Sequence, residues 1–255
     1  MAKQEEREFH DRYVTGEGNL RSVEGRFYSG AAESKETAIA FDYLGDVRGK
    51  RLLFYGSGGH FSLIRKFVQL GSEVVAIDIS PETVAGLRRA IEHEGYQNQS
   101  TAIEMDCESL DFADESFDIV FARSIIHHLN VDTSLKEIKR VLKPGGKLTV
   151  LEPLGTNPII NLYRWLTPNS RTTDEHPLIE TDLRTFKEYF PESRFHYLYF
   201  ISILAYFYRM LDGDERRFGK VFSFLNSVDG WFLKYIPLYR YLCWDVLLCC
   251  QKKSA

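Results

Sequence analysis

Cysteine is scarce in this sequence, and its arrangement indicates neither disulfides nor a redox pair. Cys107, Cys243, Cys249 and Cys250 form neither a C-x-x-C pair nor the framework of an extracellular protein. The first eight residues are charged and lack the apolar core of a signal peptide. No run of about eighteen apolar residues is present that could cross a membrane. We therefore expect a cytoplasmic protein with reduced thiols.

An excess of basic residues is also absent. The 32 Lys and Arg residues against 36 Asp and Glu give a formal net charge of −4, and no clustered basic face of the kind that nucleic acid requires is visible. The histidines lack ligand-like spacing with further donors, so no metal site is predicted. With 255 residues, 44% of them hydrophobic, the chain can bury the core of one domain, with or without an insertion.

What the sequence does contain is a stretch, residues 52–80, in which two short apolar runs flank a glycine cluster and an amphipathic segment. The first run, Leu52–Tyr55, leads into Gly56 and Gly58, which have no Cβ and let backbone N–H groups approach a ligand. The second run ends at Asp78, about twenty residues on, where a carboxylate can accept both hydroxyls of a ribose. This is the pattern of a βαβ unit that holds a nucleoside.

Two kinds of nucleotide site compete for this geometry. A dinucleotide-binding fingerprint has Gly or Ala at the sixth position of G-x-G-x-x-G, so that the helix packs closely on the strand. That position is Phe61 here, which disfavours a pyrophosphate site and, with it, a nicotinamide oxidoreductase. A ligand with a ribose but no phosphate fits better, and S-adenosylmethionine is such a ligand.

More strands and helices follow in alternation. Thr101–Met105, Phe117–Ala122 and Lys147–Glu152 have the length and apolar character of buried strands. Helices between them are indicated by apolar residues at helical spacing, and Ser80 with Pro81 marks the start of one. The last of these helices carries Leu142 on its apolar face, and the K-P-G-G segment after it is predicted to form a tight turn before the fifth strand. This order predicts an α/β fold with a doubly wound parallel sheet, in which ligands bind beyond the carboxyl ends of the strands. The residues expected at that edge are Gly56, Asp78, Asp106, Arg123 to His128, and Glu152.

Four short motifs lie along this predicted sheet: G-S-G from Gly56, S-F-D-I-V from Ser116, I-H-H-L from Ile126 and K-P-G-G from Lys143. Together they resemble the class I S-adenosylmethionine-dependent methyltransferases over roughly residues 40 to 155. The first motif of that family is D-x-G-x-G-x-G, and the chain departs from it with Phe54 in place of the aspartate and His60 in place of the third glycine. These departures leave open an alternative function, a cofactor-binding sensor or partner subunit without turnover.

The resemblance implies a Rossmann-like fold with seven mostly parallel strands, the last two, Arg194–Phe200 and Trp244–Gln251, forming an antiparallel pair. It also implies that Asp106 accepts the adenine amino group, and that an N-terminal lid segment, residues 1–34, covers the cofactor through Tyr13 and Tyr28. The alternatives are that Asp106 is a turn residue and that the tyrosines only anchor the segment. The cofactor site predicted in this way comprises Tyr28, Tyr55, Gly56, Ser57, Gly58, His60, Asp78, Ile79, Asp106, Cys107 and Arg123.

The last two predicted strands are separated by an aromatic-rich segment, residues 201–243, which is far longer than an ordinary loop. We expect it to be a helical insertion in a core domain formed by residues 35–200 and 244–255. Three uses compete: a self-packed cap, a pocket wall for a large apolar acceptor, and a surface that docks on a membrane or a second subunit. The expected acceptor is bulky and partly apolar, lipid-like or polycyclic; peripheral membrane contact and a homodimer stay open.

The predicted chemistry needs a base. Methyl transfer from a sulfonium is an in-line displacement, so the protein must hold the acceptor about 3 Å from the methyl group and remove a proton from a hydroxyl acceptor. Histidine is the natural base near neutral pH, and the candidates are His127, His128 and His176. Glu152 either orients the base, binds the acceptor hydroxyl, or is a solvated strand end.

These observations predict an enzyme that O-methylates a small molecule with a histidine as general base. The expected acceptor site is the segment after the fifth strand, residues 153–180, which is rich in functional groups. Its Arg164 and Arg171 would meet an anionic group of the acceptor, or form ordinary salt bridges. His60 is expected to shape the cofactor pocket rather than to act in catalysis.

Overall fold

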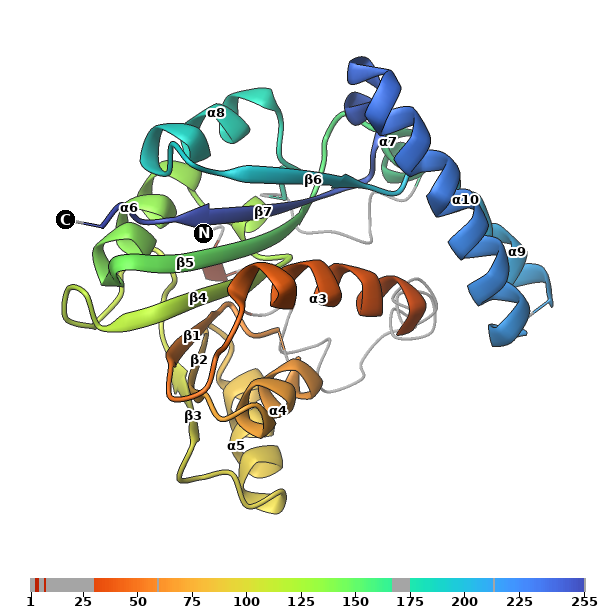
Figure 1. Cartoon of the computed structure of the whole chain (residues 1–255). Helices are drawn as coiled ribbons and strands as arrows, with labels where there is room; N and C mark the ends of the chain where they lie inside the picture. Colours follow the sequence, from red (N-terminus) through yellow and green to blue (C-terminus); the bar gives the residue numbers. More distant parts are fainter. Residues whose placement is uncertain are drawn as a thin grey trace.

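The computed structural model describes residues 3, 4, 7, 30–58, 60–166, 175–212 and 214–254. Within them the chain forms one seven-stranded sheet with helices on its faces (Figure 1). The strands are β1 (Arg51–Tyr55), β2 (Glu73–Asp78), β3 (Ser100–Glu104), β4 (Phe117–Arg123), β5 (Leu142–Pro153), β6 (Arg194–Leu198) and β7 (Asp245–Gln251). Their order is β3-β2-β1-β4-β5-β7-β6, with only β7 antiparallel to its neighbours. The predicted doubly wound sheet, with an antiparallel last pair, is confirmed.

Alternate residues of the central strands face opposite layers of helices. In β1, Leu52 and Phe54 pack with α3 (Gly30–Leu44), α4 (Phe61–Gln69) and α5 (Pro81–His93). Leu53 and Tyr55 pack with α6 (Val131–Val141) and α8 (Glu180–Tyr189) on the other face. Side chains alternate in this way because the strand backbone is pleated. Since both faces are covered, each central strand is apolar along nearly its whole length.

The predicted start of α5 is confirmed, whereas the predicted turn before β5 is wrong. Ser80 Oγ accepts a hydrogen bond from Thr83 N at 3.0 Å and caps α5. The K-P-G-G segment does not form a tight turn, because β5 already begins at Leu142, which the sequence places on the apolar face of α6. Gly145 within it has φ +74, and its N–H donates to Lys252 O at 3.0 Å. The segment is therefore an irregular extension of β5 that pairs with the C-terminal residues.

Helices join β6 to β7 as expected. They are η3 (Ile201–Ile203), α9 (Leu204–Asp212), α10 (Glu215–Tyr235) and η4 (Pro237–Leu242), which we call the cap. Figure 1 shows α9 and α10 side by side at one end of the sheet, where they also contact each other. A further helix that the sequence analysis does not predict, α7 (Pro158–Leu166), lies beside the end of α10 that leads into η4 (Figure 1).

A buried aspartate fixes the cap to the end of β6. Asp229 of α10 is 1% exposed. Its carboxylate accepts hydrogen bonds from Phe200 N at 3.1 Å, Ile201 N at 2.8 Å, Ser202 N at 3.0 Å and the Tyr239 hydroxyl at 2.7 Å. Because these donors belong to the start and the end of the cap, one carboxylate ties both to α10.

Candidate functional site

The loop after β1 lies so close to its neighbours that Gly56 has no room for a side chain. Gly56 has φ +66, and a Cβ on it would lie 2.2 Å from Ile125 Cγ1. Ser57 is fully buried, and its N–H donates to Ile77 O at 2.9 Å. Gly58, with φ +50, is exposed. The loop therefore presents backbone groups, rather than side chains, beyond the carboxyl end of β1.

Asp78, the last residue of β2, anchors this loop. Its Oδ2 accepts a hydrogen bond from Gly58 N at 2.8 Å, and its Oδ1 accepts one from Ser80 N at 3.0 Å. The residue is 7% exposed. A carboxylate offers about four acceptor positions, and the described residues occupy two of them, so the group can also accept from the hydroxyls of a ligand. Ile79, the next residue, is half-buried beside it.

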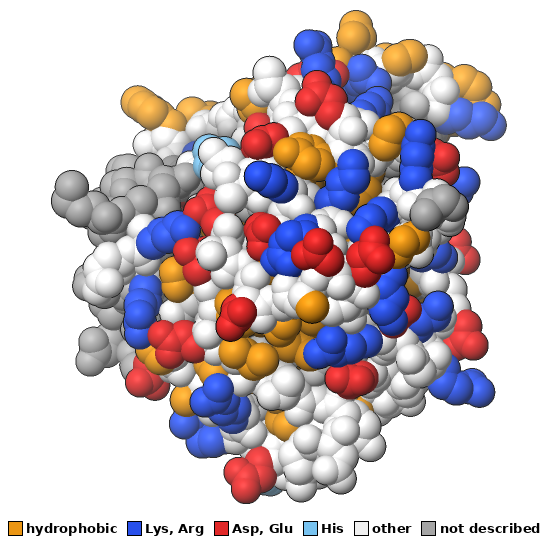
Figure 2. All heavy atoms as spheres, turned by 90° about the vertical axis from the view of Figure 1, so that its left-hand side faces the viewer, with side chains coloured by type: hydrophobic (Ala, Val, Ile, Leu, Met, Phe, Trp, Pro, Cys, Tyr) orange, Lys and Arg blue, Asp and Glu red, His pale blue; other side chains and the backbone are white. Residues whose placement is uncertain are grey.

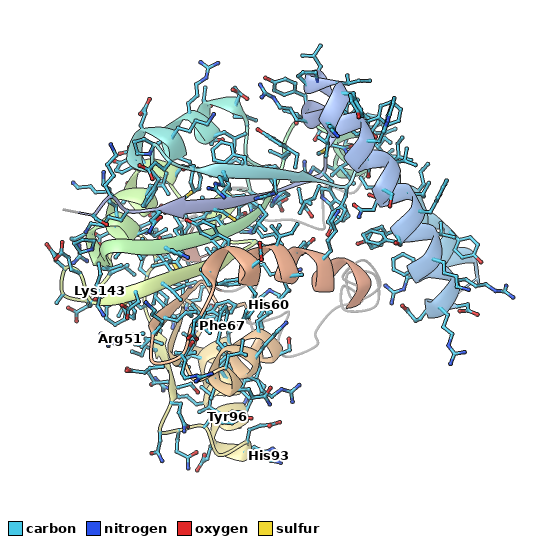
Figure 3. The ribbon with its side chains drawn as sticks, viewed as in Figure 1. Arg51, His60, Phe67, His93, Tyr96 and Lys143 are labelled. Atoms are coloured by element: carbon cyan, nitrogen blue, oxygen red, sulfur yellow. The ribbon has the colours of Figure 1, made fainter. Side chains whose placement is uncertain are left out.

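The two departures from the expected glycine motif have different surroundings. Phe54 is fully buried, and its ring centroid lies 5.2 Å from that of Phe121, so this position belongs to the core. His60 lies at the N-terminus of α4 (Figure 3), with its Cδ2 3.6 Å from the place of a Cβ on Gly58. Burial, and then the charge of Arg123, lower the pKa of His60 to about 4. His60 therefore covers the loop with a ring that is neutral at pH 7.

A buried ion pair that the sequence analysis misses lies at the end of β4. Arg123 Nη2 is 3.2 Å from Glu36 Oε2 of α3, and these side chains are 3% and 6% exposed. Tyr199 hydrogen-bonds Glu36, and burial followed by the Glu36 charge raises the pKa of Tyr199. Burial, and then Glu36, raise the pKa of Asp245 at the start of β7 well above its usual range, although Arg123 opposes them. The guanidinium of Arg123, a predicted cofactor ligand, is thus engaged within the protein.

Glu152 at the end of β5 is fully buried and orients a histidine. Its Oε1 accepts hydrogen bonds from Ile125 N at 2.9 Å and Ile126 N at 2.8 Å. Its Oε2 lies 2.5 Å from His127 Nδ1, and His127 is 6% exposed. The alternative of a solvated strand end is therefore wrong. The same carboxylate supports the turn at Ser124, whose φ of +51 a non-glycine residue rarely adopts.

The other two candidate bases line a common hollow. His128 and His176 both face a hollow of about 570 Å³, which Glu108, Asp132 and Asp182 also line. The ring of His128 lies 4.1 Å from that of His127, between centroids, and His176 N donates to His127 O at 2.8 Å. The structure thus brings the three histidines together, with His127 buried and the other two on the hollow.

The residues after β3 are held by polar contacts of their own. Asp106 Oδ1 accepts a hydrogen bond from Glu108 N at 2.9 Å, and its Oδ2 lies 2.5 Å from Lys3 Nζ. The carbonyl of buried Cys107 accepts a hydrogen bond from the Tyr55 hydroxyl at 2.6 Å. Since the Tyr55 side chain is fully buried, only its backbone could meet a ligand.

Three predicted residues, Tyr13, Tyr28 and Arg171, lie outside the residues that the structure describes, as does most of the predicted lid segment. Arg164, a candidate for binding an anionic acceptor, donates to Leu154 O at 3.1 Å and to Asn161 Oδ1 at 3.0 Å. In the part of the chain that is described, no group of three His, Cys, Asp or Glu side chains could hold a metal ion.

Comparison with known sequences gives a family match for the same part of the chain. A family model described as a methyltransferase domain matches residues 55–150. The chain is 31% identical over 170 residues to the ubiquinone/menaquinone biosynthesis C-methyltransferase of Shewanella baltica. The aligned region covers 60% of this chain and 68% of that protein. The chain is also 36% identical over 110 residues to the protein of the same name from Hahella chejuensis, covering 41% of this chain. The chain spans only 44% of the length of that second relative.

Solved structures share the fold over most of the chain. A phosphoethanolamine N-methyltransferase 2 from Haemonchus contortus, in complex with phosphomonomethylethanolamine and S-adenosylhomocysteine, has a TM-score of 0.64 at 20% identity, covering 97% of this chain and 57% of that one. The geranyl diphosphate C-methyltransferase of Streptomyces coelicolor, in complex with Mg²⁺, geranyl diphosphate and S-adenosyl-L-homocysteine, has a TM-score of 0.63 at 15% identity, covering 86% and 78%. At these identities the likeness concerns the fold alone.

Proposed function

Because the chain belongs to the class I S-adenosylmethionine-dependent methyltransferases, we propose that it transfers the methyl group of S-adenosylmethionine to a bulky, partly apolar small molecule. One observation carries the proposal: the side-chain-free loop at Gly56 and Gly58 adjoins the carboxylate of Asp78 at one edge of the sheet. When bound, S-adenosylmethionine supplies a methyl group made electrophilic by the sulfonium.

The residues at this edge fit a nucleoside without phosphate. Asp78 can also accept hydrogen bonds from the ribose hydroxyls, and the glycine loop offers backbone groups to the amino-acid end. Asp106 and half-buried Ile79 would hold the adenine. Since Phe54 is a core residue, the ammonium group must be bound by other acceptors than the acid usual in the family.

We take His127 as the general base for a hydroxyl acceptor. Glu152 binds its Nδ1 and thereby leaves Nε2 to receive a proton, the arrangement by which a carboxylate orients an imidazole in hydrolytic triads. His128 and His176 are the alternatives, because they line the neighbouring hollow. Oxygen is the proposed acceptor atom, since a hydroxyl needs such a base.

A carbon acceptor is the second candidate. The two curated relatives are named C-methyltransferases. A carbon nucleophile beside a hydroxyl or carbonyl group also loses a proton, so the same histidine would serve. Analysis of the product by NMR separates an O-methyl from a C-methyl group.

A large apolar acceptor is supported by the cap, which packs only part of its aromatic residues internally. Tyr206, Phe218 and Phe222 form a ring cluster with centroids 5.5–6.1 Å apart. Phe224 and Trp231, by contrast, are 68% and 56% exposed. The proposed enzyme is cytoplasmic and meets its acceptor on this apolar side; whether a homodimer forms there stays a prediction.

The test combines binding with turnover. Calorimetry with S-adenosylhomocysteine measures affinity for wild type, Asp78→Ala, His127→Gln and Glu152→Gln, and a panel of hydroquinones and catechols, with and without an alkyl chain, measures turnover. We expect Asp78→Ala to lose binding. We expect the other two variants to bind normally while turnover falls about a hundredfold or more. His93→Gln, exposed at the far end of α5 (Figure 3), is the control.

Two outcomes would contradict the proposal. If wild type does not bind S-adenosylhomocysteine, or Asp78→Ala binds it unchanged, the site has been misassigned. If wild type binds tightly but forms no product with any acceptor of the panel, the sensor or partner-subunit alternative gains support.

A further inference from the structure

Exposed apolar side chains are concentrated in one part of the molecule. Among the described residues, twelve large apolar side chains are well exposed, and eleven of them lie between residues 159 and 238. The twelfth is Leu70, at the end of α4. On the face shown in Figure 2, which looks at the molecule from the side away from α10, charged side chains of both signs are interspersed across the surface. The exposed apolar residues are therefore concentrated in and between α7, α10 and η4, with Ile179 and Leu204 outside these elements.

The apolar residues of α10 form a stripe opposite to its buried face. Phe224, Trp231 and Tyr235 are 68%, 56% and 57% exposed, and their spacing of seven and four residues places them on one side of a helix. The buried residues Phe218 and Phe222 lie on the other side. The helix thus carries apolar side chains on two opposite faces, and the rest of the cap covers only one of these faces.

The end of this stripe adjoins α7. Asn157, just before α7, donates to Leu242 O at the end of η4 at 2.6 Å, and Figure 1 shows α7 beside the η4 end of α10. Six of the exposed large apolar residues of α7, α10 and η4 make up what we call the docking surface: Leu162, Trp165, Leu166, Trp231, Tyr235 and Leu238. Two of the three tryptophans of the chain are among them.

Within the two segments that carry the docking surface, the exposed charges are of one sign. From Gly155 to Leu166 there is no acidic residue, and from Arg216 to Leu242 the only one is Asp229, which is 1% exposed. Lys220 and Lys234 are exposed on the same side of α10 as the aromatic stripe. An overall acidic protein therefore carries a cationic, tryptophan-containing apolar surface.

We infer that the docking surface binds the surface of an anionic lipid bilayer. Trp and Tyr favour the interface between headgroups and acyl chains, and lysines beside them attract anionic headgroups. Among the described helices none is long and apolar enough to span a membrane, so the contact is peripheral. It would place the cap, and an apolar acceptor with it, at the membrane, but the docking itself does not depend on the methyl-transfer reaction.

Flotation with lipid vesicles tests the inference without any activity assay. The full chain is mixed with vesicles of phosphatidylcholine alone, or of phosphatidylcholine and phosphatidylglycerol at about 3:1. We expect at least tenfold stronger partitioning onto the anionic vesicles, since each nearby lysine contributes about fivefold. Trp165→Ala combined with Trp231→Ala should weaken partitioning at least about tenfold.

A charge variant and a matched control complete the test. Lys220→Glu combined with Lys234→Glu should remove the preference for anionic vesicles. We expect partitioning onto these vesicles to fall roughly 25-fold or more. Leu70→Ala removes an exposed leucine outside the docking surface and should change partitioning less than twofold. Circular dichroism of each variant checks that the fold is kept.

Three outcomes would overturn the inference. Wild type could fail to float with either vesicle, or the tryptophan variant could float as well as wild type. Third, sedimentation velocity could show a wild-type dimer that the tryptophan variant converts to monomer, without vesicle binding by either. The docking surface would then be an interface between two copies of this chain.

Discussion

The glycine-loop side and the cap side of the sheet each depend on a buried aspartate, but the two carboxylates differ in the hydrogen-bond acceptor capacity that they keep for a ligand. Asp78 accepts two backbone hydrogen bonds and is 7% exposed, so it anchors the loop and still has acceptor positions for a ligand. Asp229 accepts from four residues around the cap and is 1% exposed. The hydrogen-bond acceptor capacity of Asp229 is therefore used by donors of the protein itself. The first is therefore suited to binding, and the second to holding the cap in place.

The two sides also differ in how far apart in sequence their partners lie. Asp78 binds the loop of its own βαβ unit. The cap side is joined by contacts between remote segments, such as Lys35 with Asn226 and Asn157 with Leu242. The family match ends at residue 150, before the cap begins. The matched sequence thus includes the glycine loop and Asp78 but not the cap, whereas solved structures share the fold over most of the chain.

Removing the Asp229 carboxylate should have the largest effect and separate the two sides. Asp229→Ala leaves three backbone N–H groups and the hydroxyls of Ser202 and Tyr239 without their acceptor. We expect this to cost about 3–5 kcal/mol of unfolding free energy. Urea unfolding measures this, with Ser227→Ala, an exposed residue of the same helix, as control. Affinity for S-adenosylhomocysteine at low temperature should change less than about threefold. A large loss of affinity would show that the cofactor side depends on the cap.

The converse variant is Gly56→Ala. A Cβ at 2.2 Å from Ile125 Cγ1, on a residue with φ +66, forces the loop or Ile125 to move. We expect about 2–4 kcal/mol lower stability and more than a hundredfold weaker binding of S-adenosylhomocysteine by calorimetry. The cap should stay folded, as judged by the fluorescence of Trp231. Unchanged ligand affinity would mean that the loop does not contact the cofactor.

Most of the fold could be predicted because its signals are local. The alternation of buried runs and amphipathic segments gives six of the seven strands to within two residues, and Ser80 marks a helix start through its own hydrogen bond. The exception is β5, which begins at Leu142 rather than at Lys147. The conformation of the K-P-G-G segment could not be predicted from local signals. The residue that pairs with it in the sheet, Lys252, lies near the other end of the chain. Helix α7 begins at Pro158 and is capped by Asn157, which accepts hydrogen bonds from Ile159 N and Ile160 N. This is the same kind of start signal as Ser80 with Pro81, so α7 could have been predicted.

The candidate site could be predicted only in part, for the same reason. The edge of the sheet and its acids follow from strand ends, so Asp78 and Glu152 could be named in advance. That Glu152 would be buried against His127 could not, because it depends on how the turn at Ser124 folds back. Glu36 lies in an ordinary helix with no motif, and only the packing of α3 over β4 pairs it with Arg123.

A smaller effect is expected from His60 on the glycine-loop side. The pKa of His60 is about 4 in the folded protein, against a usual value of 6.5. The unfolded chain therefore binds a proton first as the pH falls, so the contribution of neutral His60 is complete above pH 6.5 and is lost between pH 6.5 and 4. We expect wild type to lose about 1–2 kcal/mol more than His60→Gln between pH 7.5 and 5.0, measured by urea unfolding. Equal losses would show that His60 is solvated.

The smallest effect tests whether a glycine of the cap is needed as Gly56 is. Gly219 lies inside α10, and a Cβ on it would meet no atom within 4 Å. Since Ala is the better helix former, Gly219→Ala should raise the unfolding free energy by about 0.5–1 kcal/mol. Ligand affinity should not change. A destabilised variant would mean that the α10 backbone at Gly219 must approach a partner closely, as the glycine loop approaches Ile125. Both sides of the sheet would then need a glycine for close packing, and the contrast between them would be smaller than the contacts within the chain indicate.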